Sequence, residues 1–155
     1  MRNQDVLSQH HAELDRRIAL LLEKADGGDP HELGQEWNRF ERELLWHFEI
    51  EERELFPAFS RDHADEAAAL RDEHDTLQRD LLALGIRADL HFLRAEAVRA
   101  FIDDLRLHAA REDAVLYRWA REHVGEEAWT RIAAALNEMG LRRDHVSDGA
   151  AARAL

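Results

Sequence analysis

Apolar residues recur every three or four positions along most of the chain, a spacing that places them on one face of an α-helix. In the first such segment, from Asn3 to Ala25, the apolar positions are Leu7, Leu14, Ile18, Leu21 and Ala25. The next residues, Asp26 to Pro30, include two glycines and a proline and predict a loop. A first amphipathic helix followed by a tight connection is therefore expected.

Three longer segments continue the same pattern. They cover about residues 31–56, 64–84 and 92–123. Pro57 should end or kink the second helix, because proline lacks a backbone donor and clashes with the preceding turn. Gly85 should cap the third helix, and residues 86–91 should connect it to the fourth. A shorter helix is expected after Gly125, ending at Gly140.

These connections are short enough for consecutive helices to lie antiparallel. The expected fold class is all-α: an up-down-up-down four-helix bundle with an additional short C-terminal helix. A length of 155 residues suits a single domain. We assign residues 1–140 to the bundle domain with its C-terminal helix. Residues 141–155, which are charged and then alanine-rich, are assigned to a weakly ordered tail.

Histidine replaces an apolar residue once on the apolar stripe of each bundle helix. These histidines are His11, His47, His74 and His108. Glu51 and Glu112 follow the second and the fourth of them by four residues, which places each pair on one helix face, one turn apart. The pattern is an internal repeat, because 36 residues separate the first two histidines and 34 separate the last two.

Two further residues, His10 and Tyr117, lie close to these positions in the sequence. His10 falls on the polar side of the first helix, so we expect it at the surface, with substitution for His11 as a ligand as the alternative. Tyr117 follows Glu112 by five residues. We expect it to pack at an edge of the bundle, with hydrogen bonding near the site as the alternative.

Composition narrows the classes of partner and chemistry. The formal net charge is −12, and nucleic acids and anionic membranes both bind basic surfaces, so neither is an expected partner. The chain has no cysteine, which excludes disulfides, thiolate metal sites and cysteine nucleophiles. The polar N-terminus is unlike a signal peptide, and no run of about 18 apolar residues predicts a membrane span. We therefore expect a cytoplasmic location; the oligomeric state is left open.

Six inward polar groups in an apolar interior favour a metal site, because a buried charge is costly unless it is paired or bound to a metal. Imidazole combined with carboxylate suits iron, manganese or zinc, whereas calcium and magnesium prefer oxygen ligands alone. Four histidines and two glutamates exceed the ligands that a single zinc ion usually takes. Two metal ions bridged by the carboxylates would use this donor set.

The same residues resemble a known family. His11 in HHAELD, His47 and Glu51 in HFEIEERELFP, His74 in RDEHDTL, and His108 and Glu112 in HAAREDAVLY resemble the hemerythrin-like family, also called the HHE cation-binding domain. The resemblance covers about residues 5–120. It implies a non-haem centre of two carboxylate-bridged iron ions, with the four histidines as terminal ligands and the two glutamates as bridges.

Two positions depart from the oxygen-carrying members of that family. Those proteins have a further histidine one turn after the histidine of the third helix, where this chain has Gln78. Their last bridging carboxylate falls five residues after the histidine of the fourth helix, which here is Asp113. The internal repeat matches Glu51 with Glu112 and favours Glu112, so Asp113 is kept as the alternative ligand. Both departures are more typical of divergent bacterial and iron-sensing members than of oxygen carriers.

Three functions are compatible with these features. The first is a di-iron protein that binds a small ligand, namely oxygen, nitric oxide or peroxide, in redox, nitrosative or iron stress sensing. The second is an enzyme that consumes peroxide at the same centre, in the manner of a catalase or peroxidase. The third is a structural or interaction bundle with one metal ion or none.

Overall fold

A computed structural model of the chain describes residues 3–151, with side chains described for residues 3–140. Helices follow one another along this range, and none of the residues in it forms a strand. The elements are a short 3-10 turn (Asn3–Asp5), α1 (Val6–Ala25), α2 (Pro30–Glu54), α3 (Phe56–Asp62), α4 (Ala64–Asp89), α5 (Ala95–Arg111), a π-helical segment (Glu112–Leu116), α6 (Tyr117–His123) and α7 (Glu126–Ala151). The predicted all-α class is confirmed.

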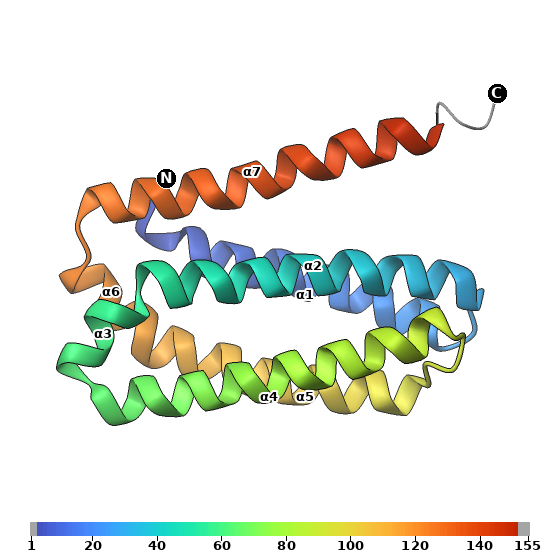
Figure 1. Cartoon of the computed structure of the whole chain (residues 1–155), viewed down its shortest axis with the longest axis horizontal. Coiled ribbons are helices and arrows are strands. Elements are labelled where there is room, and N and C mark those ends of the chain that lie inside the picture. The colour runs from blue at the N-terminus through green and yellow to red at the C-terminus, as the bar shows by residue number, and fades with distance from the viewer. Residues whose placement is uncertain (1–2, 152–155) are drawn as a thin grey trace.

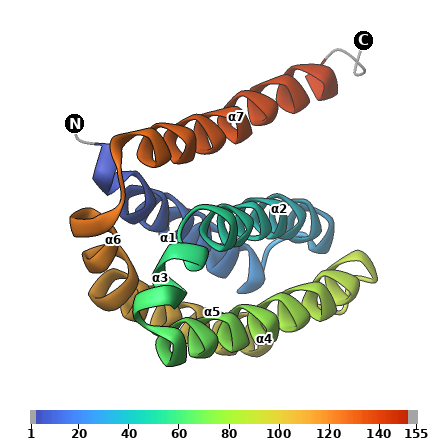
Figure 2. The same cartoon turned by 60° about the vertical axis from the view of Figure 1, so that its left-hand side comes forward.

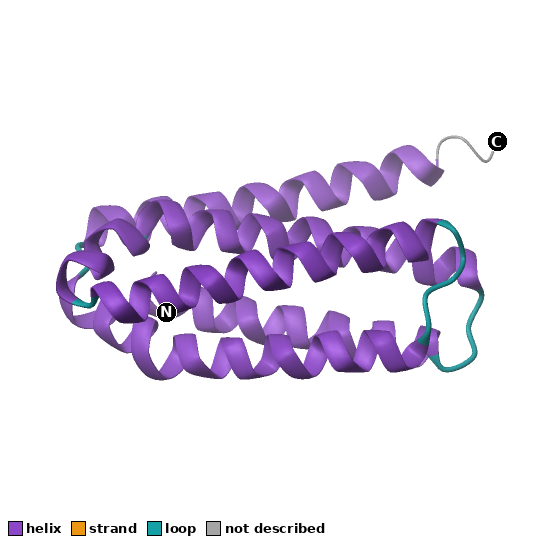
Figure 3. Ribbon diagram, turned by 60° about the horizontal axis from the view of Figure 1, so that its bottom comes forward, coloured by secondary structure: helices purple, strands orange, loops and turns teal. Residues whose placement is uncertain are grey.

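Four of the long helices, α1, α2, α4 and α5, form a ring. α1 packs against α2 and α5, and α4 packs against the same two helices. Figures 1 and 2 show the short helices α3 and α6 at one end of this ring, and α7 outside it, with its first turns beside α1 and α2. The connections lie at the two ends of the molecule (Figure 3). No helix in the described part of the chain is long and apolar enough to cross a membrane.

Local sequence explains where α2 begins and ends. The Asp29 side chain accepts a hydrogen bond from the backbone N–H of His31 at 3.0 Å, and Pro30 occupies the first helical turn, where its missing donor is harmless. At the other end α2 stops at Glu54, and α3 begins at Phe56 with Pro57 in its first turn. The predicted break at this proline is confirmed.

Two predicted helix ends are wrong. Gly85 does not cap α4, which continues to Asp89. A Cβ atom at Gly85 would collide with the Glu41 side chain and crowd Trp37 of α2, so this glycine permits close helix packing. Gly140 does not end α7, which continues to Ala151. Of the tail predicted to be weakly ordered, residues 152–155 lie outside the described residues.

The interior consists of two apolar cores with a polar layer between them. The first core lies within the ring and includes Leu14, Ile18, Trp37, Phe40, Leu44, Phe48, Leu77, Leu81, Phe101 and Leu105. The second core lies toward α3, α6 and the start of α7 and includes Leu7, Ile50, Phe56, Phe59, Leu70, Leu116, Tyr117, Trp129 and Ile132. On each ring helix the predicted histidine falls between residues of the two cores, so the four histidines share one layer.

Candidate metal centre

The polar layer brings together all six predicted inward groups. Five of them are buried, and the sixth, His11, has a side chain that is 12% exposed. They come from every helix of the ring and from the π-helical segment that follows α5: His11, His47, Glu51, His74, His108 and Glu112.

One half of the layer, the α1–α2 half, is built around His11 and His47. Their Nε2 atoms lie 3.1 Å apart. Glu51 Oε1 lies 3.2 Å from His47 Nε2, and Glu112 Oε2 lies 3.3 Å from His11 Nε2. Four donor atoms of the types that bind metals therefore converge within 4.8 Å of one another.

The other half, the α4–α5 half, is built around His74 and His108. Glu112 Oε1 lies 3.0 Å from His74 Nε2 and 2.8 Å from His108 Nε2. Glu51 Oε2 lies 3.4 Å from His74 Nε2. Each glutamate thus presents one carboxylate oxygen to the α1–α2 half and the other to the α4–α5 half.

The second ring nitrogen of every histidine faces an outer partner. These Nδ1 contacts are His11 with Asp113 at 3.5 Å, His47 with His10 at 2.8 Å, His74 with Glu52 at 2.8 Å, and His108 with Glu73 at 2.6 Å. Metal-binding histidines typically have such a partner, which fixes the ring orientation and the tautomer. All four imidazoles are therefore held with Nε2 directed at the centre of the layer.

The two candidate carboxylates of the fourth predicted helix differ in position. Glu112 is buried and begins the π-helical segment, a local widening of the helix that is frequent at functional sites. The Asp113 side chain is 45% exposed and accepts a hydrogen bond from Ser8 Oγ at 3.0 Å. The structure thus places Glu112 inside the layer and Asp113 behind His11. Gln78 lies one turn after His74 and is half-buried.

Two site residues lie elsewhere than the sequence predicts. His10 is buried rather than at the surface, and its ring stacks on His47 with a centroid distance of 5.0 Å. Tyr117 does not pack at the edge of the bundle, because its hydroxyl lies 3.0 Å from His11 Nε2. The internal repeat pairs both residues with positions next to the site. His10 precedes His11 as Glu73 precedes His74, and Tyr117 corresponds to Phe56.

The buried donors fit a bound cation. Among the described residues, Glu51 Oε2, Glu112 Oε2 and His108 Nε2 are buried atoms whose contacts with the facing charged groups lack hydrogen-bond geometry. Leaving a buried polar group without a partner costs about 1–3 kcal/mol, and more when the group is charged. A cation coordinated by these atoms would remove that cost. Nitrogen and carboxylate donors in this combination suit iron, manganese or zinc.

Protons hold the cluster together when no metal is bound. Burial lowers the pKa of His11, but hydrogen bonding to Asp113 and Glu112 outweighs it and raises the pKa to about 10. For His74, burial is likewise outweighed by Glu112, Glu51 and Glu52, and the pKa rises to about 11. Burial tends to raise the pKa of Glu112, yet its histidine partners keep that pKa well below 4.5. Metal binding must therefore displace protons from imidazolium groups.

This charge arrangement predicts that the metal-free protein loses stability as the pH rises from neutral to alkaline. A histidine with a raised folded-state pKa stabilises the fold below its unfolded pKa of about 6.5, and the contribution is lost as the pH rises through the folded value. The folded-state pKa is about 10 for His11 and about 11 for His74, so their stabilising contribution is lost as the pH rises toward these values. The pKa values of Glu51 and Glu112 are lowered, so these groups have the opposite pH dependence. They stabilise the fold above their unfolded pKa of 4.5, and this stabilisation is lost as the pH falls below it.

Thermal unfolding of the metal-free protein between about pH 4 and pH 10 tests this expectation. The melting temperature should be highest between the two titration ranges and should fall on the alkaline side. The metal-loaded protein should lack the alkaline decline, because the cation replaces the protons. A melting temperature of the metal-free protein that stays constant above about pH 6.5 would contradict the imidazolium–carboxylate pairing.

Comparison with known proteins identifies the family. The family described as the hemerythrin HHE cation-binding domain matches residues 2–120, which include all six inward groups. No curated protein and no solved structure gave a significant match. The chain belongs to the hemerythrin HHE cation-binding family, and the match together with the histidine and glutamate cluster indicates a metal-binding site.

Proposed function

We propose that this hemerythrin family member is a di-iron protein that binds a small ligand at the polar layer. The terminal ligands would be His11 and His47 in the α1–α2 half, and His74 and His108 in the α4–α5 half. Glu51 and Glu112 would bridge the two ions. The observation that carries the proposal is the orientation of these glutamates, each with one oxygen toward either half.

The number and type of donors support two ions of iron. A single ion with two or three histidines would leave the remaining imidazoles and carboxylate oxygens buried without a cation. The family is named for cation binding, and its resemblance to hemerythrins favours iron over manganese or zinc. Bound iron would supply a redox-active centre with coordination positions left for an exogenous ligand. The ring of contacts among α1, α2, α4 and α5 also supports the up-down-up-down order predicted for these helices.

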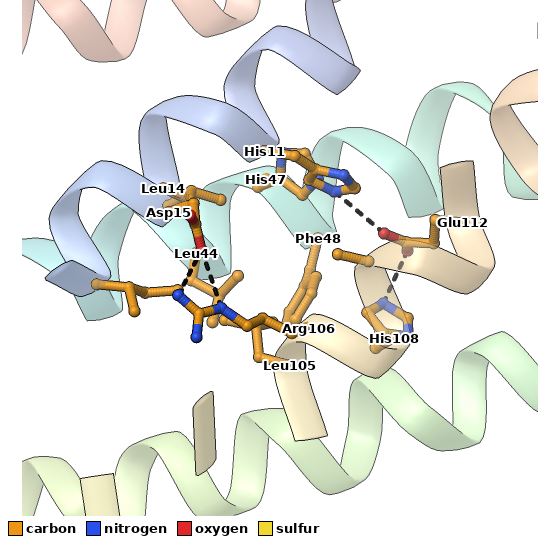
Figure 4. Close-up of a pocket in the computed structure, with 12 residues that line it drawn as sticks. His11, Leu14, Asp15, Leu44, His47, Phe48, Leu105, Arg106, His108 and Glu112 are labelled. Carbon is orange, nitrogen blue, oxygen red and sulfur yellow. Dashed lines mark hydrogen bonds and ion pairs between the residues drawn. The ribbon is translucent and has the colours of Figure 1, made fainter. Parts of the chain in front are cut away.

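A cavity beside the centre supports a ligand of a few atoms. Its volume is about 40 Å³, which compares with about 10–15 Å³ for one water molecule. Four of its lining residues belong to the polar layer, and the walls are mainly apolar: Leu14, Ile18, Leu44, Phe48, Leu105 and Ala109. Figure 4 shows an ion pair between Arg106 and Asp15 on the side of the cavity away from Glu112 and His108.

This lining favours a small uncharged molecule, because polar or charged ligands pay to leave water for apolar walls. Oxygen and nitric oxide meet that condition better than peroxide. We therefore place ligand binding, with a role in redox, nitrosative or iron stress sensing, ahead of peroxide consumption. Partners are expected to be such small molecules rather than nucleic acids or membranes, in keeping with the net charge of −12.

The direct test is metal analysis of protein purified with iron available or reconstituted with ferrous iron without oxygen. Two irons per chain are expected. A chain that retains less than about a tenth of that amount after reconstitution would refute the di-iron proposal, since buried sites of this kind bind metal tightly. Peroxide consumption by the loaded protein, lost when iron is lost, would favour the enzyme instead.

Filling the cavity should block the ligand and spare the metal. Ala109→Leu adds a branched side chain to the cavity wall, and we expect at least a tenfold weaker affinity for nitric oxide, equivalent to about 1.4 kcal/mol. Iron content should stay at the wild-type level. Ala110→Leu is the matched control, because Ala110 is the next residue and is exposed. Equal ligand affinity in both variants would show that the ligand does not use this cavity.

A further inference from the structure

The two halves of the polar layer match residue by residue. Along the chain, Glu51 corresponds to Glu112, and the outer partners Glu52 and Asp113 correspond as well, each 61 residues apart. The spatial contacts follow the same rule. Glu52 faces His74, and Asp113 faces His11.

This correspondence fails at two positions, and both failures affect the α1–α2 half. The Nδ1 atom of His47 contacts His10, whereas the Nδ1 atom of the equivalent His108 contacts Glu73. Tyr117 stands where the other half has Phe56. The two rings are placed alike: the Tyr117 ring lies 5.1 Å from the His11 ring at 33°, and the Phe56 ring lies 5.1 Å from the His74 ring at 26°. The hydroxyl group is therefore the chemical difference between two equivalent aromatic side chains.

The hydroxyl of Tyr117 lies among the donor atoms of the α1–α2 half. It is 3.0 Å from His11 Nε2 and 3.1 Å from His47 Nε2, and it donates a hydrogen bond to Glu51 Oε1. Two ligand atoms at right angles around an ion, each about 2.1 Å from it, are about 3.0 Å apart. The phenol oxygen and the two imidazole nitrogens have the mutual spacing of neighbouring ligands around one ion.

We propose that Tyr117 coordinates the iron held by His11 and His47 through its phenol oxygen. Phe56 offers no such donor to the ion held by His74 and His108, so the two irons are chemically inequivalent. Coordination releases the phenol proton, as metal binding to a protonated ligand generally does. The inference rests on the proposed di-iron function and adds a ligand that the histidine and carboxylate pattern does not include.

The position of Tyr117 is compatible with ligand access. Tyr117 belongs to the second core, whereas the walls of the cavity belong largely to the first core. The phenol therefore enters the polar layer from the side of the second core, and the cavity reaches the layer from the side of the first core. Coordination by Tyr117 would fix one position of this iron and leave the cavity side open to the exogenous ligand.

Spectroscopy of the ferric protein tests the assignment. A phenol oxygen bound to ferric iron produces a strong charge-transfer band in visible light, and resonance Raman excitation in that band enhances the ring vibrations of the tyrosine. Tyr117 is the only tyrosine of the chain, so these signals can have no other source within it. We expect both signals in the wild-type protein with two irons bound, and we expect Tyr117→Phe to lose both while keeping its iron.

The comparison separates this inference from the proposed function. Tyr117→Phe should fold, because the equivalent position in the other half already holds phenylalanine. Two irons in the wild type without tyrosine vibrations, or with a spectrum that Tyr117→Phe leaves unchanged, would overturn coordination by Tyr117 and leave the di-iron proposal intact. Failure of the wild type to bind iron would overturn both.

Discussion

Glu112→Ala is expected to abolish metal binding at the polar layer. Among the described residues, Glu112 has the shorter contacts with histidine nitrogens in both halves of the polar layer, all within 3.3 Å, whereas Glu51 lies 3.4 Å from His74. In the proposed di-iron centre, removal of the Glu112 carboxylate would take a donor from each ion and would remove a negative charge that offsets both cations. Loss of an outer partner typically weakens metal binding about 10–100-fold, and loss of this shared ligand should exceed that range. Metal analysis after reconstitution and dialysis measures the effect.

Two control variants separate loss of a metal ligand from loss of an outer partner or of a surface charge. Asp113→Ala removes only the partner of His11 Nδ1, and a loss of about 10–100-fold is expected. Glu122→Ala removes an exposed glutamate and should bind metal like the wild type. Circular dichroism of each metal-free variant checks that the helices form. A greater loss with Asp113→Ala than with Glu112→Ala would show that Asp113 is the ligand.

Of the substitutions proposed here, Phe48→Ala should lower the free energy of unfolding of the metal-free protein most, by about 3–5 kcal/mol. Phe48 is 1% exposed and lies where the first core meets the polar layer. Its ring stacks on His74 at 4.1 Å and meets His108 edge-on at 5.8 Å. Truncation would leave a cavity and would also remove the surface that holds both imidazoles. Urea unfolding, followed by circular dichroism, gives the free energy of unfolding.

Phe92→Ala is the matched control for that experiment. Phe92 is the same residue type but is 73% exposed, and surface substitutions of this kind usually change stability by less than about 0.5 kcal/mol. Similar losses in the two variants would mean that Phe48 does not support the core as described. A metal-loaded Phe48→Ala sample should also bind iron more weakly, because the orientation of His74 would no longer be fixed by packing.

The helix pattern and the inward histidines could be predicted because burial has a simple period in a helix. Each ring helix alternates three- and four-residue steps, so a histidine on the stripe, such as His74, must point inward. Pro57 interrupts α2 for a reason that depends only on its own ring. These features need no knowledge of how the helices pack.

The misplaced residues depend on neighbours that a helical period does not contain. His10 lies off the stripe of α1, but α2 covers that flank and the His47 ring stacks on it. Gly85 could have ended a helix, but the close approach of Trp37 and Glu41 gives it a packing role instead. Tyr117 follows the π-helical segment, whose extra residue shifts the register of what comes after it. Tertiary contact thus decided the outcome for His10 and Gly85, and the local widening of the helix decided it for Tyr117.

The outer carboxylates give the buried centre a connection to bulk water. Glu73, Glu52 and Asp113 each contact an imidazole Nδ1, and their side chains are 32%, 38% and 45% exposed. The His74–Glu52 and His108–Glu73 contacts are hydrogen bonds of 2.8 Å and 2.6 Å, so each forms a two-group relay through which a proton can pass between the layer and the solvent while the helices stay closed. His47 differs, because its partner His10 is buried. Protons can therefore be exchanged with the surroundings at two of the four histidines without local unfolding.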